Sequence, residues 1–203
     1  MPKKPRVEAL IDGIFAVSMT LLVLDIRIPD GVRLDSNADL SGHLAALGQA
    51  FEVYVFSFVV LAMFWVAHGI QFRFVARLDK PLLWVNFGFL LLTTTVPFTT
   101  NLLSGHGRLS AAVTLFAANL LLLDAGLLLH IHRLRSKPGL ATPALTPMLG
   151  RSIELRLLAI CAVPLIAAAV AQVAPEWGMR CLYLMALAHF SPRRTEEAPD
   201  AED

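Results

Sequence analysis

Long apolar segments alternate with short polar connections along most of the chain. Roughly 20 helical residues are needed to cross a hydrocarbon core about 30 Å thick. Six segments come near that length, at about residues 8–28, 44–70, 82–98, 109–131, 153–173 and 177–190. The pattern therefore predicts an all-α integral membrane protein with six transmembrane helices, of which the last is the shortest.

The polar connections define the expected organisation between these spans. The segment DGVRLDSNADLSG after the first span is predicted to be a short outer loop, and the Pro- and Gly-rich segment SKPGLATPALTPMLG is predicted to link two groups of helices. Residues 191–203 are acidic and contain Pro, as is typical of a disordered segment. We therefore expect one six-helix transmembrane domain over residues 1–190, followed by a disordered cytoplasmic tail over residues 191–203.

Basic residues gather in alternate connections, on one predicted side of the membrane. Cytoplasmic loops of membrane proteins carry an excess of Lys and Arg. The N-terminus, the second and fourth connections and the tail hold Lys3, Lys4, Arg6, Arg73, Arg77, Lys80, Arg133, Arg135, Lys137, Arg151, Arg156, Arg193 and Arg194. The opposite side holds Arg27, Arg33, Arg108 and Arg180. This asymmetry and the even number of spans predict that both termini are cytoplasmic.

Composition supports the membrane assignment and excludes several functions. The chain is 56% hydrophobic and 16% charged, whereas soluble domains average about 45–50% and about 25%. A formal net charge of +1 argues against a nucleic-acid partner, which requires a strong basic excess. Cys161 and Cys181 lie in apolar runs and are interpreted as small hydrophobic residues. The sequence has no nucleophile elbow, H-E-x-x-H or glycine-rich phosphate loop, so we expect neither an enzyme nor a cofactor or metal site.

One face of the first predicted helix combines small and branched apolar residues with a hydroxyl group. At 3.6 residues per turn this face consists of Leu10, Gly13, Val17, Leu21, Leu24 and Ile28, with Thr20 at its border. The face fits a helix-packing stripe, which is the commoner use of small residues in membranes, with the Thr20 hydroxyl bonded to the carbonyl of Ala16. Alternatively, several copies surround a pore, in which Val17, Leu21 and Leu24 form apolar rings and Thr20 forms a hydroxyl ring.

Polar side chains also occur near the inner ends of the first two spans. Asp12 lies near the start of the first helix, where the helix dipole favours an anion, so a structural interfacial role is favoured over ion binding. Trp65 and His68 are three residues apart and share one face of the second helix. On their own they fit an aromatic anchor and an interfacial residue.

Asp124 is a carboxylate deep in the fourth span, in the segment LLLLDAGLLLH, and Asn119 on the same helix could bond to a neighbouring helix. Intramembrane carboxylates mark functional sites by default, but the basic inner end nearby favours a salt bridge from Asp124 to Arg156 or Arg151. Pro97 is predicted to kink or end the third span, and Pro164 to kink the fifth.

Three ordered motifs give the sequence a more specific signature. In the segment RVEALIDGIFAVSMTLLVLDIRIP, Arg6 is followed after three residues by Leu10, Ile11 and Asp12. The second span contains FWVAH, with Phe64, Trp65 and His68, and the third contains LLWVNFGFLLLTTTVPFTT, with Trp84, Asn86, Pro97 and Phe98. Together these segments resemble the first three helices of the transmembrane protein 175 family of potassium channels, known from endosomes, lysosomes and prokaryotes. Leu10 and Ile11 replace the Phe-Ser pair of that family, and the resemblance covers about residues 6–100.

The resemblance implies a six-helix subunit of a homotetramer in which four copies of the first helix line a pore. It implies a potassium-permeable cation channel in a prokaryotic plasma membrane, in contact with lipid and permeant monovalent cations. By position, Val17, Leu21 and Leu24 would form the constriction and Thr20 a polar layer. The network that holds the pore helix in place would consist of Arg6, Asp12, Trp65, His68 and Asn86.

Two other functions fit the same residues. A proton-coupled transporter or proton leak pathway would use Asp12, His68 and Asp124 as relays. A non-conducting membrane scaffold or sensor would use the helices for packing alone. Ion flux in purified proteoliposomes separates these three possibilities.

Overall fold

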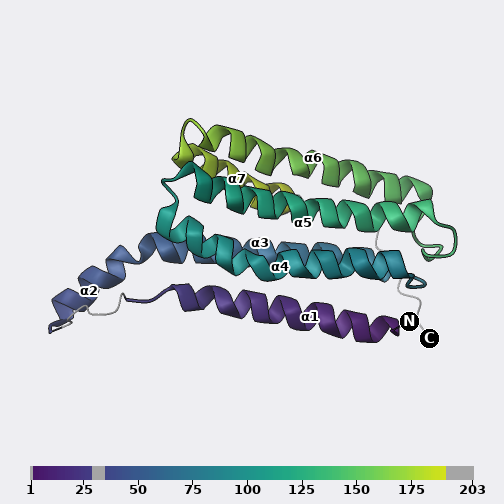
Figure 1. Cartoon of the computed structure of the whole chain (residues 1–203), viewed down its shortest axis with the longest axis horizontal. Helices are drawn as coiled ribbons and strands as arrows, with labels where there is room; N and C mark the ends of the chain where they lie inside the picture. Colours follow the sequence, from purple (N-terminus) through teal and green to yellow (C-terminus); the bar gives the residue numbers. More distant parts are fainter. Residues whose placement is uncertain (1, 29–34, 191–203) are drawn as a thin grey trace.

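The computed structural model describes residues 2–28 and 35–190, with side-chain surroundings up to residue 183. The named elements of the described chain are all helices, with seven α-helices and one 3₁₀ helix (Figure 1). In chain order these are α1 (Lys4–Leu21), η1 (Leu22–Asp25), α2 (Asn37–Ala46), α3 (Gly48–Arg73), α4 (Lys80–His106), α5 (Ser110–Ser136), α6 (Pro147–Ala171) and α7 (Pro175–Phe190). The all-α prediction is confirmed. The expected disordered tail lies outside the described residues.

Five helical segments are long and apolar enough to cross a membrane, namely α1 with η1, α3, α4, α5 and α6. They correspond to the first five predicted spans. The sixth predicted span corresponds to α7, which has 16 residues and is therefore shorter than the roughly 20 residues of a typical membrane span.

The long helices lie side by side along the longest axis of the subunit (Figure 1). Helix α5 contacts α3, α4, α6 and α7, whereas α1 contacts only α3 and α4 among the other long helices of the described chain. Figure 1 shows α1 at one edge of the bundle and α6 at the opposite edge. The first helix therefore has one face toward its own subunit and another face away from it.

The predicted outer loop after the first span is partly helical, which corrects the expectation. Helix α2 begins after Ser36, whose hydroxyl oxygen accepts a hydrogen bond from the backbone N–H of Asp39 at 3.1 Å. Such side-chain capping satisfies an N–H group that has no partner inside the helix. None of the residues of α2 is buried, and Figure 1 shows the helix extending away from the bundle.

Two predicted helix ends also differ from the structure. The first span was expected to reach Ile28, but the α-helix ends at Leu21 and the 3₁₀ turn ends at Asp25. Ile28 precedes Pro29, and the residue before a proline disfavours helical backbone angles. Conversely, α4 continues through Pro97 to His106, so the alternative that Pro97 ends the helix is wrong. Pro164 likewise lies inside α6.

The inner connections form a joined unit, which we call the loop junction (residues 74–79 and 133–142). Val75 and Ala141 form an antiparallel β-bridge. On either side of it, the N–H of Ala76 donates to the Leu140 carbonyl at 2.7 Å, and the N–H of Thr142 donates to the Phe74 carbonyl at 2.8 Å. The predicted linker between helix groups is thus bonded to the α3–α4 loop.

An acidic residue adds ion pairs to the loop junction. Asp79 caps α4, because its carboxylate accepts a hydrogen bond from the N–H of Leu82 at 2.9 Å. The same carboxylate binds Arg133 at 2.6 Å and Lys137 at 3.2 Å. Burial acts to raise the pKa of the Asp79 carboxyl, but the hydrogen bonds from the α4 N-terminus and from the two cations outweigh it and lower that pKa.

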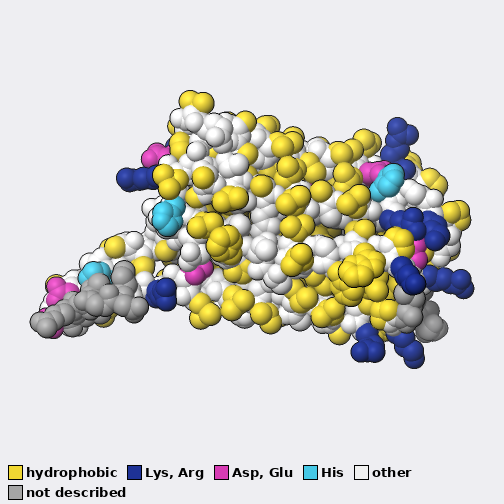
Figure 2. Space-filling model, viewed as in Figure 1, with side chains coloured by type: hydrophobic (Ala, Val, Ile, Leu, Met, Phe, Trp, Pro, Cys, Tyr) yellow, Lys and Arg dark blue, Asp and Glu magenta, His cyan; other side chains and the backbone are white. Residues whose placement is uncertain are grey.

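Charge is distributed unevenly along the bundle, as the sequence predicts. Figure 2 shows most Lys and Arg side chains at the end that holds the N-terminus of α1 and the loop junction, whereas apolar side chains cover much of the flank. Membrane proteins combine an apolar flank with a basic cytoplasmic end. We refer to the basic end as the inner end.

Candidate pore helix and the contacts that hold it

The buried face of α1 attaches it to its own subunit. This face consists of Val7, Ile11, Phe15, Ser18 and Leu22. Phe15 is 1% exposed, and its ring centroid lies 6.0 Å from that of Phe89 on α4. Apolar contacts of this kind fix how α1 is rotated about its own axis.

The opposite face of α1 is the one singled out in the sequence, and the subunit leaves it uncovered. Val17 is 58% exposed, Leu21 43% and Leu24 65%. A Cβ atom placed on Gly13 would meet no atom within 4 Å. The stripe therefore does not pack against another helix of the same subunit in the described chain. Within the described residues, this stripe is left open to its surroundings.

Thr20 lies beside this uncovered face and is itself exposed. Its hydroxyl donates a hydrogen bond to the carbonyl of Val17 at 2.9 Å, not to that of Ala16. Because the hydroxyl hydrogen points back to the helix, the oxygen lone pairs stay available as acceptors.

Asp12 joins α1 to α3 through one of the predicted partners. The indole Nε1–H of Trp65 donates to Asp12 Oδ1 at 2.8 Å. Both side chains lie at the protein surface, and Trp65 is 44% exposed. A tryptophan donates through its indole N–H alone, so this bond uses the full polar capacity of Trp65.

His68 and Asn86 form a second predicted pair, which is buried between α3 and α4. His68 Nε2 lies 2.7 Å from Asn86 Oδ1, and the Asn86 amide nitrogen donates to the Leu82 carbonyl at 2.8 Å. Since the amide oxygen is an acceptor, the His68 Nε2 carries the proton in this arrangement. The imidazole stacks on Phe89, with ring centroids 4.8 Å apart, and on Phe72, at 5.5 Å.

The five residues of the predicted network thus occupy three different environments. Asp12 and Trp65 form an exposed pair, and His68 and Asn86 form a buried one. Arg6 is exposed, and within the described residues no hydrogen bond or ion pair involves its side chain. Trp65 and His68 lie on successive turns of α3, so the two pairs are neighbours along that helix.

A second buried imidazole lies beside His68 and did not stand out in the sequence. His130 on α5 is 1% exposed, and its ring centroid is 5.3 Å from that of His68. Its Nδ1 lies 2.9 Å from the Oε1 of Gln71 on α3. His68 Nδ1 and His130 Nε2 have no hydrogen-bond partner within the described residues.

Two further contacts hold α1, and sequence reasoning missed both. At the inner end, Lys4 Nζ donates to the Val75 carbonyl at 3.0 Å. At the outer end, Asn101 Nδ2 of α4 donates to Asp25 Oδ1 at 2.8 Å. Lys4 was interpreted only as part of the basic N-terminus, and nothing in the sequence around Asn101 indicates its partner. With the Asp12–Trp65 bond, α1 is held at three levels.

The structure does not contain the salt bridge predicted for Asp124. This residue is 0% exposed, and neither carboxylate oxygen has a hydrogen-bond partner in the described residues. The prediction of a bond to Arg156 or Arg151 is therefore wrong. The register between α5 and α6 leaves the Asp124 carboxylate without either arginine as a partner.

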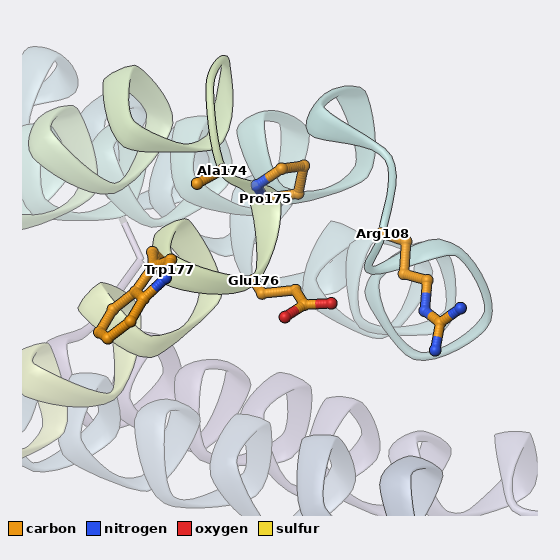
Figure 3. Close-up of a pocket in the computed structure, with 5 residues that line it drawn as sticks. All are labelled: Arg108, Ala174, Pro175, Glu176 and Trp177. Atoms are coloured by element: carbon orange, nitrogen blue, oxygen red, sulfur yellow. The ribbon is translucent and has the colours of Figure 1, made fainter.

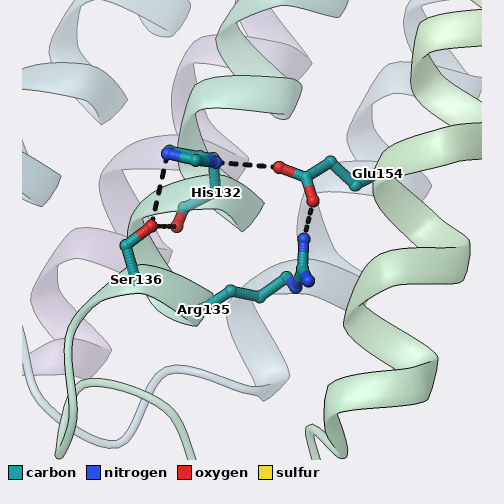
Figure 4. A network of polar contacts seen from close by, with 4 residues as sticks. All are labelled: His132, Arg135, Ser136 and Glu154. Carbon is teal, nitrogen blue, oxygen red and sulfur yellow. Dashed lines mark hydrogen bonds and ion pairs between the residues drawn. The ribbon is translucent and has the colours of Figure 1, made fainter.

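Figure 4 shows polar contacts between α5 and α6 at the inner end. The Glu154 carboxylate binds His132 Nδ1 at 2.8 Å and also forms an ion pair with Arg135. The Arg135 side chain passes Gly150 before it reaches Glu154. A Cβ placed on Gly150 would lie 2.7 Å from Arg135 Cδ. A larger residue at position 150 would have to displace the Arg135 side chain.

The outer end has an open hollow at the α6–α7 turn (Figure 3). Its lining residues are Arg108, Ala174, Pro175, Glu176 and Trp177. Figure 3 shows the Glu176 carboxylate pointing to the side of the hollow where Arg108 lies. The hollow is far along the bundle from the loop junction and shares no residue with the contacts of α1. Among the described residues, no three His, Cys, Asp or Glu side chains are grouped to hold a metal ion.

The fold and the site together define a multi-pass, all-α membrane protein whose first helix lies at the edge of the helix bundle, with an apolar face that the described residues leave uncovered. Residues 6–97 match the model of a family described as "Endosomal/lysosomal potassium channel TMEM175". Over these residues, which make up a little under half of the chain, the sequence is similar to the TMEM175 family.

Individual relatives and one solved structure are similar to the chain as well. The chain is 37% identical over 118 residues, 58% of its length, to a protein of Streptomyces collinus named a potassium channel. It is 38% identical over 84 residues, 39% of its length, to a Bos taurus protein named endosomal/lysosomal proton channel TMEM175. The aligned segments span 56% of the bacterial protein and 18% of the bovine one.

The crystal structure is of a channel homologue from Chamaesiphon minutus, described as lysosomal, potassium-selective and of the TMEM175 type. It superimposes with a TM-score of 0.80 at 24% identity, covering 92% of this chain and 95% of that one. At this identity the likeness establishes the fold. Because it covers 92% of this chain, the likeness extends well beyond residue 97, where the family match ends.

Proposed function

We propose that the chain is the subunit of a homotetrameric, potassium-permeable cation channel in a prokaryotic plasma membrane. Each subunit would contribute six spans, counting α7, with both termini cytoplasmic. Four copies of α1 would surround the pore and turn their uncovered faces toward it. The potassium-channel names of the bacterial relatives support the ion and the class of protein.

The observation that carries the proposal is the division of α1 into two faces. Its buried face packs against α3 and α4, and its other face exposes Val17, Leu21 and Leu24 at the edge of the subunit. A helix used only to fill the bundle would be buried among its neighbours. Four edge helices that meet at an axis enclose a conduit without any change in the fold of each subunit.

Permeation follows from the chemistry of that face. Rings of Val17, Leu21 and Leu24 form apolar constrictions that pass ions only when wetted. The Thr20 hydroxyls, held by the Val17 carbonyl at 2.9 Å, offer oxygen ligands between the rings. Potassium holds its water less tightly than sodium does, so an apolar ring favours potassium. Without a rigid ring of carbonyls, the selectivity for potassium over sodium would be modest.

The network residues hold the pore helix in this proposal. Asp12 and Trp65 join α1 to α3 directly. His68 and Asn86 join α3 to α4, which fixes the surface on which α1 rests. Arg6, exposed at the inner end, would contribute positive charge near the cytoplasmic mouth and lipid headgroups. No cofactor takes part, and the permeant potassium ion is the cargo.

Proteoliposomes that contain the purified protein test the proposal. Potassium flux is measured under an imposed gradient, and the measurement is repeated with sodium and with a proton gradient. Leu21→Asn is expected to raise leak flux and to lower the potassium-to-sodium ratio, because a polar ring stays wetted. Leu91→Asn on α4, where the leucine is 67% exposed, is the matched control and leaves both quantities unchanged. Equal behaviour of the two variants would refute the pore assignment.

A proton pathway is the second candidate, and two observations favour it. The vertebrate relatives are named proton channels, and His68 lies beside His130 with ring centroids 5.3 Å apart. In this alternative, protons pass between the imidazoles of His68 and His130, and Asp12 and Asp124 act as relays at other depths in the membrane. Proton flux that persists without potassium and is abolished by His68→Gln would support it. A scaffold or sensor would show no flux of any ion.

A further inference from the structure

Lys4 has a set of contacts that its neighbour Lys3 lacks. The Lys4 ammonium donates to the Val75 carbonyl at 3.0 Å and lies 5.8 Å from the centre of the Phe72 ring. It also lies 3.9 Å from the Glu8 carboxylate. Lys3 is exposed, and within the described residues its side chain makes no hydrogen bond or ion pair. Two adjacent residues of equal charge therefore differ in their attachment to the protein.

Val75, whose carbonyl accepts the hydrogen bond from Lys4, is also joined to the α5–α6 linker. Val75 forms the β-bridge to Ala141. The flanking bond from the Thr142 N–H to the Phe74 carbonyl is 2.8 Å long. The ion pairs of Asp79 with Arg133 and Lys137 close the same unit. A chain of direct contacts thus runs from the linker, through Val75, to the first turn of α1.

We propose that Lys4 and the loop junction form a clamp that holds the inner end of α1 back from the pore axis. The inference rests on the proposed channel function and names Lys4 as a positioning residue for it. In a tetramer the uncovered apolar faces of four α1 helices attract one another, because their association removes apolar surface from water. The clamp opposes this inward movement at the inner end. The bonds of Asp12 and Asp25 act further along the first span.

The test compares two variants with two matched controls. Lys4→Gln removes the ammonium, and Lys3→Gln removes an equal charge that has no contact. Thr142→Pro removes the N–H that donates to Phe74, whereas Ala144→Pro places proline at a linker position whose N–H makes no bond within the described residues. Flux and hydrogen–deuterium exchange are measured for each protein in proteoliposomes.

Lys4→Gln and Thr142→Pro are each expected to lower potassium flux by at least about fivefold relative to their controls. The potassium-to-sodium ratio stays the same, since the residues of the constriction are untouched. Both variants also speed exchange in the first two turns of α1. Lys4→Arg restores flux, because a guanidinium donates to the same carbonyl. The double variant of Lys4→Gln and Thr142→Pro is expected to have the potassium flux of the more affected single variant, because both substitutions break the same chain of contacts.

Several outcomes overturn the clamp. They are equal flux for Lys4→Gln and Lys3→Gln, higher flux for Lys4→Gln, and α1 exchange in Thr142→Pro that matches Ala144→Pro. If Thr142→Pro does not fold, the Lys4 series decides alone. Absence of flux from the unmodified protein overturns the channel function instead, and the exchange data still report whether the linker holds α1.

Discussion

Replacing Trp65 with Phe removes one hydrogen-bond donor and keeps most of the ring. The indole N–H donates to Asp12 Oδ1 at 2.8 Å. A hydrogen bond to a carboxylate is stronger than one between neutral groups. Hydrogen bonds to charged groups contribute about 1.5–3 kcal/mol. Trp65 is 44% exposed, so water competes for both partners, and we expect a loss of only about 1 kcal/mol in the free energy of unfolding.

For a chain of this length, about 1 kcal/mol corresponds to a fall in Tm of about 2–4 °C. The assay is thermal unfolding of the detergent-solubilised protein, followed by circular dichroism. Trp84→Phe is the matched control, because Trp84 is 71% exposed and its contact is an edge-on packing against Phe87. Removing its N–H should leave Tm within about 1 °C of the unmodified value.

A double-mutant cycle between Trp65→Phe and Asp12→Ala isolates the bond itself. The expected coupling is about 1 kcal/mol, because each single variant already removes the whole interaction. A coupling below about 0.3 kcal/mol would be indistinguishable from additivity. That result would refute the view that this bond holds α1 against α3.

Two further predictions concern buried or paired carboxylates. Asp79→Asn lowers Tm at neutral pH, because the lowered pKa of Asp79 means that its charged form stabilises the fold. That contribution is fully present above the unfolded pKa and is lost as the pH falls through the lower folded value, so the Tm difference between unmodified and Asp79→Asn protein shrinks in strong acid. Asp124→Leu raises Tm, because it replaces a fully buried carboxyl that has no partner in the described residues. A fall in Tm for this variant would show that Asp124 has a stabilising role.

The helical architecture could be predicted because each long span carries its own signal. Apolar runs of sufficient length mark α3, α4, α5 and α6 wherever they pack. Predicted ends were less accurate, since they depend on local competition. Pro97 lies in the threonine-rich segment TTTVPFTT and is accommodated within α4. The capping signal of Ser36 and Asp39 was present in the sequence, but the polarity of α2 concealed its helix.

The candidate site was predictable where side chains share a helix face or a family motif. Trp65 and His68 stood out for both reasons, and the structure gives each a polar partner. The contacts of Lys4 with Val75 and of Asn101 with Asp25 join residues 71 and 76 positions apart. No local pattern encodes such a distance. The same holds for Asp124, because the register between α5 and α6 decides which side chain it meets.

The edge position of α1 separates the part of the subunit that would meet ions from the part that keeps the subunit folded. Helix α5 touches four other helices, whereas α1 adds its buried face to a bundle that is already packed. The side chains at positions 17, 20, 21 and 24 are exposed, so an exchange there disturbs the packing of that bundle less than an exchange on the buried face of α1. If the chain forms the proposed pore, conduction can change at these positions at little cost to the stability of the fold.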